Sequence, residues 1–183
     1  MCTSWAIRNA SLLLYASLIW RVFGTKKEHL RLSRRPSIID FFGKHPALHP
    51  ILIAELSKQV DAASAESLGS LFSTLLLLSL VHTPDDSAEA TALVEPFLPY
   101  VEACGASKVW KVREAAAAAL TGLVSPNQTW GYVRDIVHRL ERAKEQNAIH
   151  GSLLQLQHLL NTASTPAPKA FGESLMVIID NVN

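Results

Sequence analysis

The residues with the clearest chemical potential are basic side chains between positions 21 and 35. They are Arg21, Lys26, Lys27, Arg31, Arg34 and Arg35, and Glu28 is the one acidic residue among them. Lysine and arginine in such a cluster can neutralise backbone phosphates, which gives salt-sensitive and largely sequence-independent affinity for RNA. The sequence therefore predicts an RNA contact here. The alternative is a solvated loop whose charges only keep the chain soluble.

A second set of polar side chains lies on an otherwise apolar stretch near the C-terminal end. It consists of Asn147, His150 and Gln155. On a helix, these side chains could face the concave surface of a solenoid and bind a partner. Alternatively, Asn147 caps the helix and His150, one turn further on, is satisfied by its neighbours. The residues leave both interpretations open.

The sequence contains none of the common signatures of enzymes and metal sites. Its glycines stand singly, so no Gly-rich loop could hold a nucleotide or S-adenosylmethionine. No His-Glu-x-x-His pattern and no Gly-x-Ser-x-Gly pattern is present. We therefore expect no catalytic residue, no metal site and no cofactor.

A tryptophan followed by an arginine three positions later occurs twice, and small or apolar residues follow both times. The pairs are Trp5 with Arg8 and Trp110 with Arg113. This motif is typical of the second helix of a HEAT or armadillo repeat. We expect the tryptophans to be packing anchors between repeats, because base stacking would need an exposed ring. We expect the arginines to pair with an acidic residue or with carbonyls of a neighbouring repeat.

The elements that position these residues follow a repeat of roughly 40 residues. Val112 and Ile149 hold equivalent places 37 positions apart, and Leu68 lies 44 positions before Val112. An extra polar segment, 24–46, separates the helix at 4–23, which matches the second helix of a repeat, from the helices that follow. The pattern predicts one all-α solenoid segment of HEAT/armadillo type over 1–183, with about four repeat units and a basic insertion at 24–46.

Hydrophobic periodicity predicts the helices, and Pro, Gly, Ser or Asp residues mark the turns between them. The expected helices span 4–23, 47–62, 66–81, 87–104, 109–123, 129–146, 148–161 and 169–180. Pro96 and Pro99 should kink or split the fourth of them, because proline lacks the backbone donor. The charged helix that follows Trp110's helix should present a solvated face, with Asp135 and Arg139 spaced to pair.

Composition limits the class of protein. With 49% hydrophobic and 18% charged residues, the chain can bury a core, and its net charge of +1 gives no global attraction to nucleic acid or membrane. The apolar runs 10–20 and 71–81 are shorter than the roughly 20 residues of a membrane helix. Two distant cysteines fit a reducing, cytoplasmic compartment. Because neither end shows a polar capping face, we expect an internal slice of a longer solenoid.

Several runs resemble the thyroid adenoma-associated protein family, whose fungal members are partners of a tRNA ribose methyltransferase. They are 4–15, 21–27, 40–42 with 45–48, 108–116 and 147–155. The Arg-Arg-Ser-Ala-Gly-Leu-Pro run that is typical of the family is absent from this chain.

The resemblance implies a non-catalytic α-solenoid subunit. Such a subunit would bind a tRNA 2′-O-methyltransferase and assist methylation of a ribose in the anticodon loop, with tRNA as a further partner and no membrane. The alternative is a generic helical-repeat adaptor that binds only proteins.

Overall fold

The computed structural model describes residues 10, 13–15, 17–19, 21, 23, 35–60 and 65–163. The chain divides into two compact units, Met1–Pro36 and Ser37–Asn183. In the first unit, the described residues up to position 23 are helical, as the sequence predicts. Phe23 is buried there, whereas Leu13, Leu14 and Leu18 are exposed.

The described part of the second unit is built from helices. They are α3 (Ile38–Lys44), α4 (Leu48–Val60), α5 (Ala65–Leu78), α6 (Ala88–Val94), α7 (Leu98–Cys104), α8 (Trp110–Leu123), α9 (Thr129–Arg142) and α10 (Gln146–Thr162). The only extended pairing among the described residues is an isolated bridge between Ser37 and His82. No helix in these described ranges is both long and apolar enough to cross a membrane.

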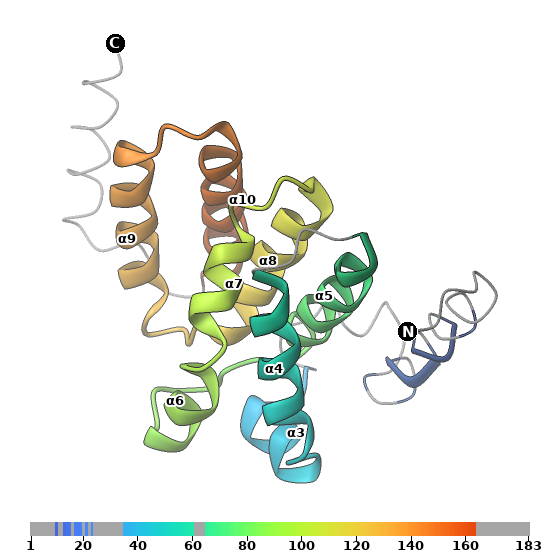
Figure 1. Cartoon of the computed structure of the whole chain (residues 1–183). Helices are drawn as coiled ribbons and strands as arrows, with labels where there is room; N and C mark the ends of the chain where they lie inside the picture. Colours follow the sequence, from blue (N-terminus) through green and yellow to red (C-terminus); the bar gives the residue numbers. More distant parts are fainter. Residues whose placement is uncertain are drawn as a thin grey trace. The chain divides into compact units, whose positions relative to one another are not determined.

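The helices of this unit pack as pairs in two layers (Figure 1). Helix α4 packs against α5, α7 against α8, and α9 against α10. The second helices lie side by side in the order α5, α8, α10, and α4 lies beside α7. Stacked helix pairs of this kind form an α-solenoid. The predicted all-α solenoid is confirmed.

Helix α8 is the central member of the second layer, and its composition explains how it fits there. Ala116, Ala117 and Ala119 are fully buried, as is Leu120. Small side chains let the backbones of α5, α7 and α10 approach α8 on several sides, while alanine keeps the helix propensity high. The alanine run that follows Trp110 and Arg113 therefore allows other helices to pack on several sides of α8.

The two prolines divide the expected fourth helix. Helix α6 ends at Val94, and α7 begins at Leu98 with Pro99 in its first turn. Proline is tolerated in a first turn because that N–H has no helical acceptor, but it breaks a helix interior. The predicted split is confirmed.

The expected polar insertion at 24–46 is wrong for its last third. Ser37 caps α3 by accepting a hydrogen bond from the Asp40 N–H, and Ile38, Phe41 and Phe42 are buried. Phe42 stacks on Phe97 with ring centroids 5.8 Å apart. Apolar residues spaced by three and four positions form one face of a helix, and that face packs into the core. Residues 24–34 lie outside the described part.

One other boundary differs from the expectation. Helix α9 ends at Arg142 and not near 146. Within α9, Asp135 pairs with Arg134 at 3.6 Å, so the expected pairing with Arg139 is wrong. The expected helix at 169–180 lies outside the described residues.

Candidate functional site at a repeat boundary

Arg113 gathers polar groups from two successive repeats. Its Nη1 donates to the Ser107 carbonyl at 2.6 Å and to Asn147 Oδ1 at 3.1 Å, and its Nε donates to His150 Nδ1 at 3.0 Å. Arg113 lies on α8, Asn147 and His150 lie on α10, and Ser107 lies in the turn before α8. We call Ser107, Arg113, Asn147 and His150 the Arg113 cluster. It joins two neighbouring second helices.

The cluster holds a buried cation through neutral acceptors. Arg113 is only 8% exposed, and a buried charge is tolerated when its donors are satisfied. Because a guanidinium has no acceptor, His150 Nδ1 must accept, which puts the imidazole proton on Nε2. The arrangement fixes the register of α10 on α8.

Two glycines allow successive repeats to approach closely. A Cβ on Gly151 of α10 would overlap the carbonyl oxygen of Gly105, in the turn after α7. A Cβ on Gly122 of α8 would lie 2.6 Å from the Leu78 carbonyl oxygen, where α5 ends. Helices α8 and α10 thus each carry a glycine where the backbone of the preceding repeat passes them.

A second polar contact lies beside the Arg113 cluster. Arg139 of α9 donates from Nη1 to Glu102 of α7 at 3.2 Å and from Nη2 to Gln155 of α10 at 3.4 Å. The Gln155 side chain is only 2% exposed. Among the described residues, no group accepts from the buried Arg139 Nε. Arg139 therefore links three helices from two repeats.

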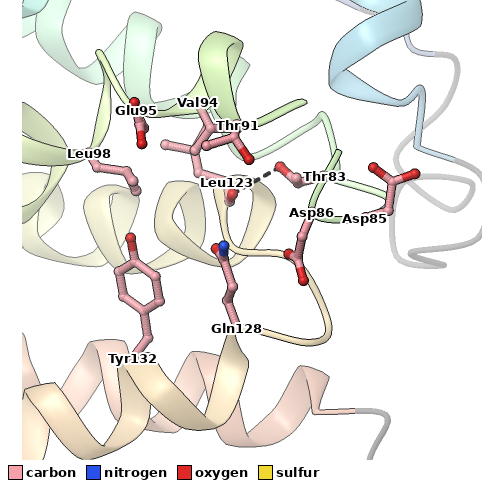
Figure 2. A pocket seen from close by; sticks show the side chains of 10 residues that line it. All are labelled: Thr83, Asp85, Asp86, Thr91, Val94, Glu95, Leu98, Leu123, Gln128 and Tyr132. Carbon is pink, nitrogen blue, oxygen red and sulfur yellow. Dashed lines mark hydrogen bonds between the residues drawn. The ribbon is translucent and has the colours of Figure 1, made fainter. Parts of the chain in front are cut away.

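Polar contacts also join the repeats near the C-terminal end of α8. Thr83 Oγ1 donates to the carbonyls of Gly122 and Leu123 at 3.0 and 2.9 Å, and Ser125 Oγ donates to Asp86. Thr83, Asp86 and Leu123 line a pocket of about 160 Å³ (Figure 2). It is lined by Thr83, Asp85, Asp86, Thr91, Val94, Glu95, Leu98, Leu123, Gln128 and Tyr132.

The pocket is lined by a mixture of carboxylates, hydroxyls and apolar side chains. Asp85 accepts from the Ser87 N–H at 3.0 Å, and hydrogen bonding with the Ser87 side chain and backbone lowers the pKa of its carboxyl. Burial and the nearby carboxylate of Glu102 raise the pKa of Tyr132, so its hydroxyl stays protonated. Within the described ranges, no group of three or more His, Cys, Asp or Glu side chains could hold a metal ion.

The three predicted partner-binding residues are placed differently from one another. Asn147 and His150 meet at Arg113, whereas Gln155 points to Arg139. The expected alternative in which Asn147 caps the helix is wrong, because α10 begins at Gln146 and has no side-chain cap. Only the His150 residue of the three is exposed. A role of these residues in binding a partner stays a prediction.

The prediction that Trp110 is a packing anchor between repeats is wrong. The residue begins α8 and is 49% exposed. Arg113, three positions further on, is buried against Asn147 and His150 of α10, whereas Trp110 in the first turn stays largely exposed. Trp5 and Arg8 lie outside the described residues.

The predicted RNA-binding cluster is only partly described. Arg21 is exposed on a helical stretch, and Arg35 is half-buried, which lowers the pKa of its guanidinium. Lys26, Lys27, Arg31 and Arg34 lie outside the described residues. Their contact with RNA stays a prediction.

Sequence reasoning missed Gly105, Gly151, Glu102 and Arg139 as members of the repeat boundary. One available signal was Gly151, since glycine inside a helix costs about 1 kcal/mol and often marks close backbone approach. Glu102 and Arg139 lie 37 positions apart, the same separation as Arg113 and His150. That shared spacing could have suggested both contacts.

Paired helices joined through buried polar contacts and close glycine approaches define a helical-repeat scaffold. The chain belongs to the family described as Trm732, C-terminal TPR repeats, whose model matches residues 8–159. TPR units are also helix pairs, so this description agrees with the observed solenoid, although the sequence pattern had indicated HEAT or armadillo repeats.

Curated relatives are named as regulators of a tRNA methyltransferase. The chain is 35% identical over 173 residues to the tRNA (32-2′-O)-methyltransferase regulator THADA of Homo sapiens, covering 87% of this chain and 9% of that protein. It is 33% identical over 167 residues to the regulator trm732 of Schizosaccharomyces pombe, covering 86% of this chain and 11% of that protein. The chain thus spans about a tenth of the length of these relatives. No solved structure matches it significantly.

Proposed function

We propose that this chain is a scaffold segment of a non-catalytic regulator that assists 2′-O-methylation of tRNA by a partner methyltransferase in the cytoplasm. The observation that carries the proposal is the family match over residues 8–159, together with relatives named as regulators of such an enzyme. The buried free thiol of Cys104 fits a reducing compartment.

The placement of the family-like runs supports a scaffolding role. The run 108–116 contains Arg113, and the run 147–155 contains Asn147, His150 and Gly151. These runs meet at one repeat boundary through the Arg113 cluster and the Gly105–Gly151 approach. The residues of these two runs therefore position helices, which is what a solenoid segment contributes to a larger assembly.

We propose in addition that the basic residues between Arg21 and Arg35 contact the phosphates of tRNA. Their charge and close spacing support this contact. Reversing the charge of Lys26, Lys27, Arg34 and Arg35 should weaken tRNA binding and make it less sensitive to salt. Unchanged binding would exclude this segment as the RNA contact.

A segment replacement tests the main proposal. The region of the fission yeast regulator that aligns with this chain is exchanged for residues 8–159, and ribose methylation at tRNA position 32 is measured. We expect the exchanged protein to restore methylation to a strain that lacks the regulator. Methylation no higher than in that strain, from a stably accumulating protein, would count against the proposal.

The second candidate function is a protein-only adaptor. Apolar side chains are exposed on the second helices, namely Phe72 and Leu76 on α5 and Leu153 and Leu160 on α10. Exposed apolar residues on a solenoid surface suit protein docking. This function predicts that charge reversal of the basic residues leaves methylation unchanged.

A further inference from the structure

The exposed ring of Trp110 lies at a rigidly held position. The Ser107 carbonyl, three residues earlier, accepts from Arg113 Nη1 at 2.6 Å, and Ser107 Oγ accepts from the Val109 N–H at 3.3 Å. The short segment before α8 is therefore anchored to the buried Arg113. A ring carried on backbone that is already ordered costs less conformational entropy when a ligand stacks on it than a ring on a loose segment.

Positive charge lies beside this ring. Lys111 Nζ lies over the Trp110 ring, 4.5 Å from its centroid, and the lysine side chain is 62% exposed. Lys108 is exposed two positions before the ring, and the first turn of α8 contains no acidic residue. Glu114 accepts from Lys111 at 3.5 Å, but both side chains are well exposed, so the pair is weak.

Two lysines beside one exposed tryptophan fit RNA better than protein. Lysine is depleted in the cores of protein interfaces, where tryptophan is enriched. Sites for single-stranded nucleic acid instead combine aromatic rings for stacking with cations for the backbone. Because the ring was expected to be buried, base stacking was not predicted from the sequence.

We propose that Trp110 is a stacking platform for an unpaired RNA base, with Lys108 and Lys111 contacting the flanking phosphates. This inference rests on the proposed function, which supplies tRNA as the RNA. A hairpin loop offers unpaired bases, whereas a continuous duplex does not. The platform therefore distinguishes loop from stem.

The test measures binding of the 183-residue chain to a labelled RNA hairpin with a seven-nucleotide loop and to a blunt RNA duplex. Trp110→Ala should weaken hairpin binding about tenfold, since stacking on one aromatic ring is worth about 1–3 kcal/mol per base. Trp110→Phe should keep most of the affinity. Changing Lys108 and Lys111 to Ala should lower the slope of log affinity against log salt by about 1.4, at about 0.7 per contact.

Two variants serve as matched controls. Ile51→Ala removes another exposed apolar side chain, on α4, and Lys58→Ala removes an exposed lysine on the same helix. Neither should change hairpin binding more than about twofold, because surface changes away from a contact have small effects. The platform is overturned if the chain binds no hairpin, if Trp110→Ala binds as the unaltered chain does, or if Ile51→Ala loses as much affinity.

A protein-binding role for Trp110 can be distinguished from RNA stacking. If the Trp110→Ala variant keeps RNA binding but no longer binds a methyltransferase, the platform is overturned. The segment replacement reports separately on the proposed function. If replacement restores methylation while Trp110→Ala binds RNA normally, only the platform fails. If Trp110→Ala weakens RNA binding but replacement restores nothing, the proposed function fails and the platform stands.

Discussion

Arg113 Nε donates a hydrogen bond of 3.0 Å to His150 Nδ1 across the boundary between two repeats. The two residues lie on different second helices, α8 and α10, at equivalent positions of successive repeats. A charged donor paired with a neutral imidazole keeps the buried guanidinium satisfied without a carboxylate. The bond ties the two family-like runs into one interface.

Removing this guanidinium should destabilise the solenoid. Arg113→Ala leaves three acceptors without their donor and should lower the free energy of unfolding by about 2–3 kcal/mol. Arg113→Lys should lower the free energy of unfolding by less, because lysine keeps the positive charge but lacks the planar guanidinium that bonds several acceptors. Urea unfolding followed by circular dichroism measures both. Lys111→Ala is the surface control, expected within about 0.5 kcal/mol of the unaltered chain; equal losses at both positions would contradict the role of the cluster.

Two helical glycines should respond in opposite ways to alanine. Gly151→Ala places a methyl group against the Gly105 backbone and should cost about 3 kcal/mol or more. Gly131→Ala on α9 meets no atom within 4 Å and should stabilise by up to about 1 kcal/mol through helix propensity. Thermal unfolding of both variants tests this. A Gly151→Ala chain as stable as Gly131→Ala would show that the repeats do not pack this closely.

The ion pair between Arg139 and Glu102 should matter much less than the Arg113 cluster. Both side chains are more than a third exposed, so water screens their attraction. Glu102→Gln should cost less than about 1 kcal/mol and should make stability less sensitive to salt. Asp135→Asn, on the same helix as Arg139, is the control. A loss larger than that of Arg113→Ala would reverse this ranking.

The thiol of Cys104 should make stability depend on alkaline pH. Burial raises its pKa from the ordinary 9.0 to about 11. Above pH 9 the unfolded thiol ionises while the folded one keeps its proton, so unfolding becomes more favourable between pH 9 and 11. The loss should approach about 1.4 kcal/mol per pH unit from this group.

Comparison with Cys104→Ala isolates that contribution. The difference in unfolding free energy between the two chains should change across pH 9 to 11 and stay constant below pH 8. Tyr132, whose pKa is also raised, is common to both chains and cancels. A pH-independent difference would show that the thiol is not desolvated.

The sequence predicted the layered helices well because their signals are local. Periodic apolar residues and the Pro96 and Pro99 breaks are enough to place α4 through α8. Helix α3 was missed because seven residues between polar segments give a weak periodic signal, and only packing against Phe97 and its neighbours reveals its buried face.

The site was harder to predict because it depends on how repeats stack. The spacing of Trp110 and Arg113 indicated the start of a second helix but not which of the two side chains faces the next repeat. Burial of Arg113 follows from the position of α10, which supplies Asn147 and His150 as acceptors, whereas Trp110 stays exposed. Contacts between residues 34 or more positions apart are not encoded in local patterns, and only the repeat spacing points to them.

The measurement that tests the central claim most directly is ribose methylation at tRNA position 32 in fission yeast that carries the segment replacement. Three versions of residues 8–159 are compared: the unaltered segment, Gly131→Ala and Gly151→Ala. If the segment acts as a packed scaffold of the regulator, the first two restore methylation and Gly151→Ala does not. Full methylation with Gly151→Ala, or none with the unaltered segment, would contradict the claim.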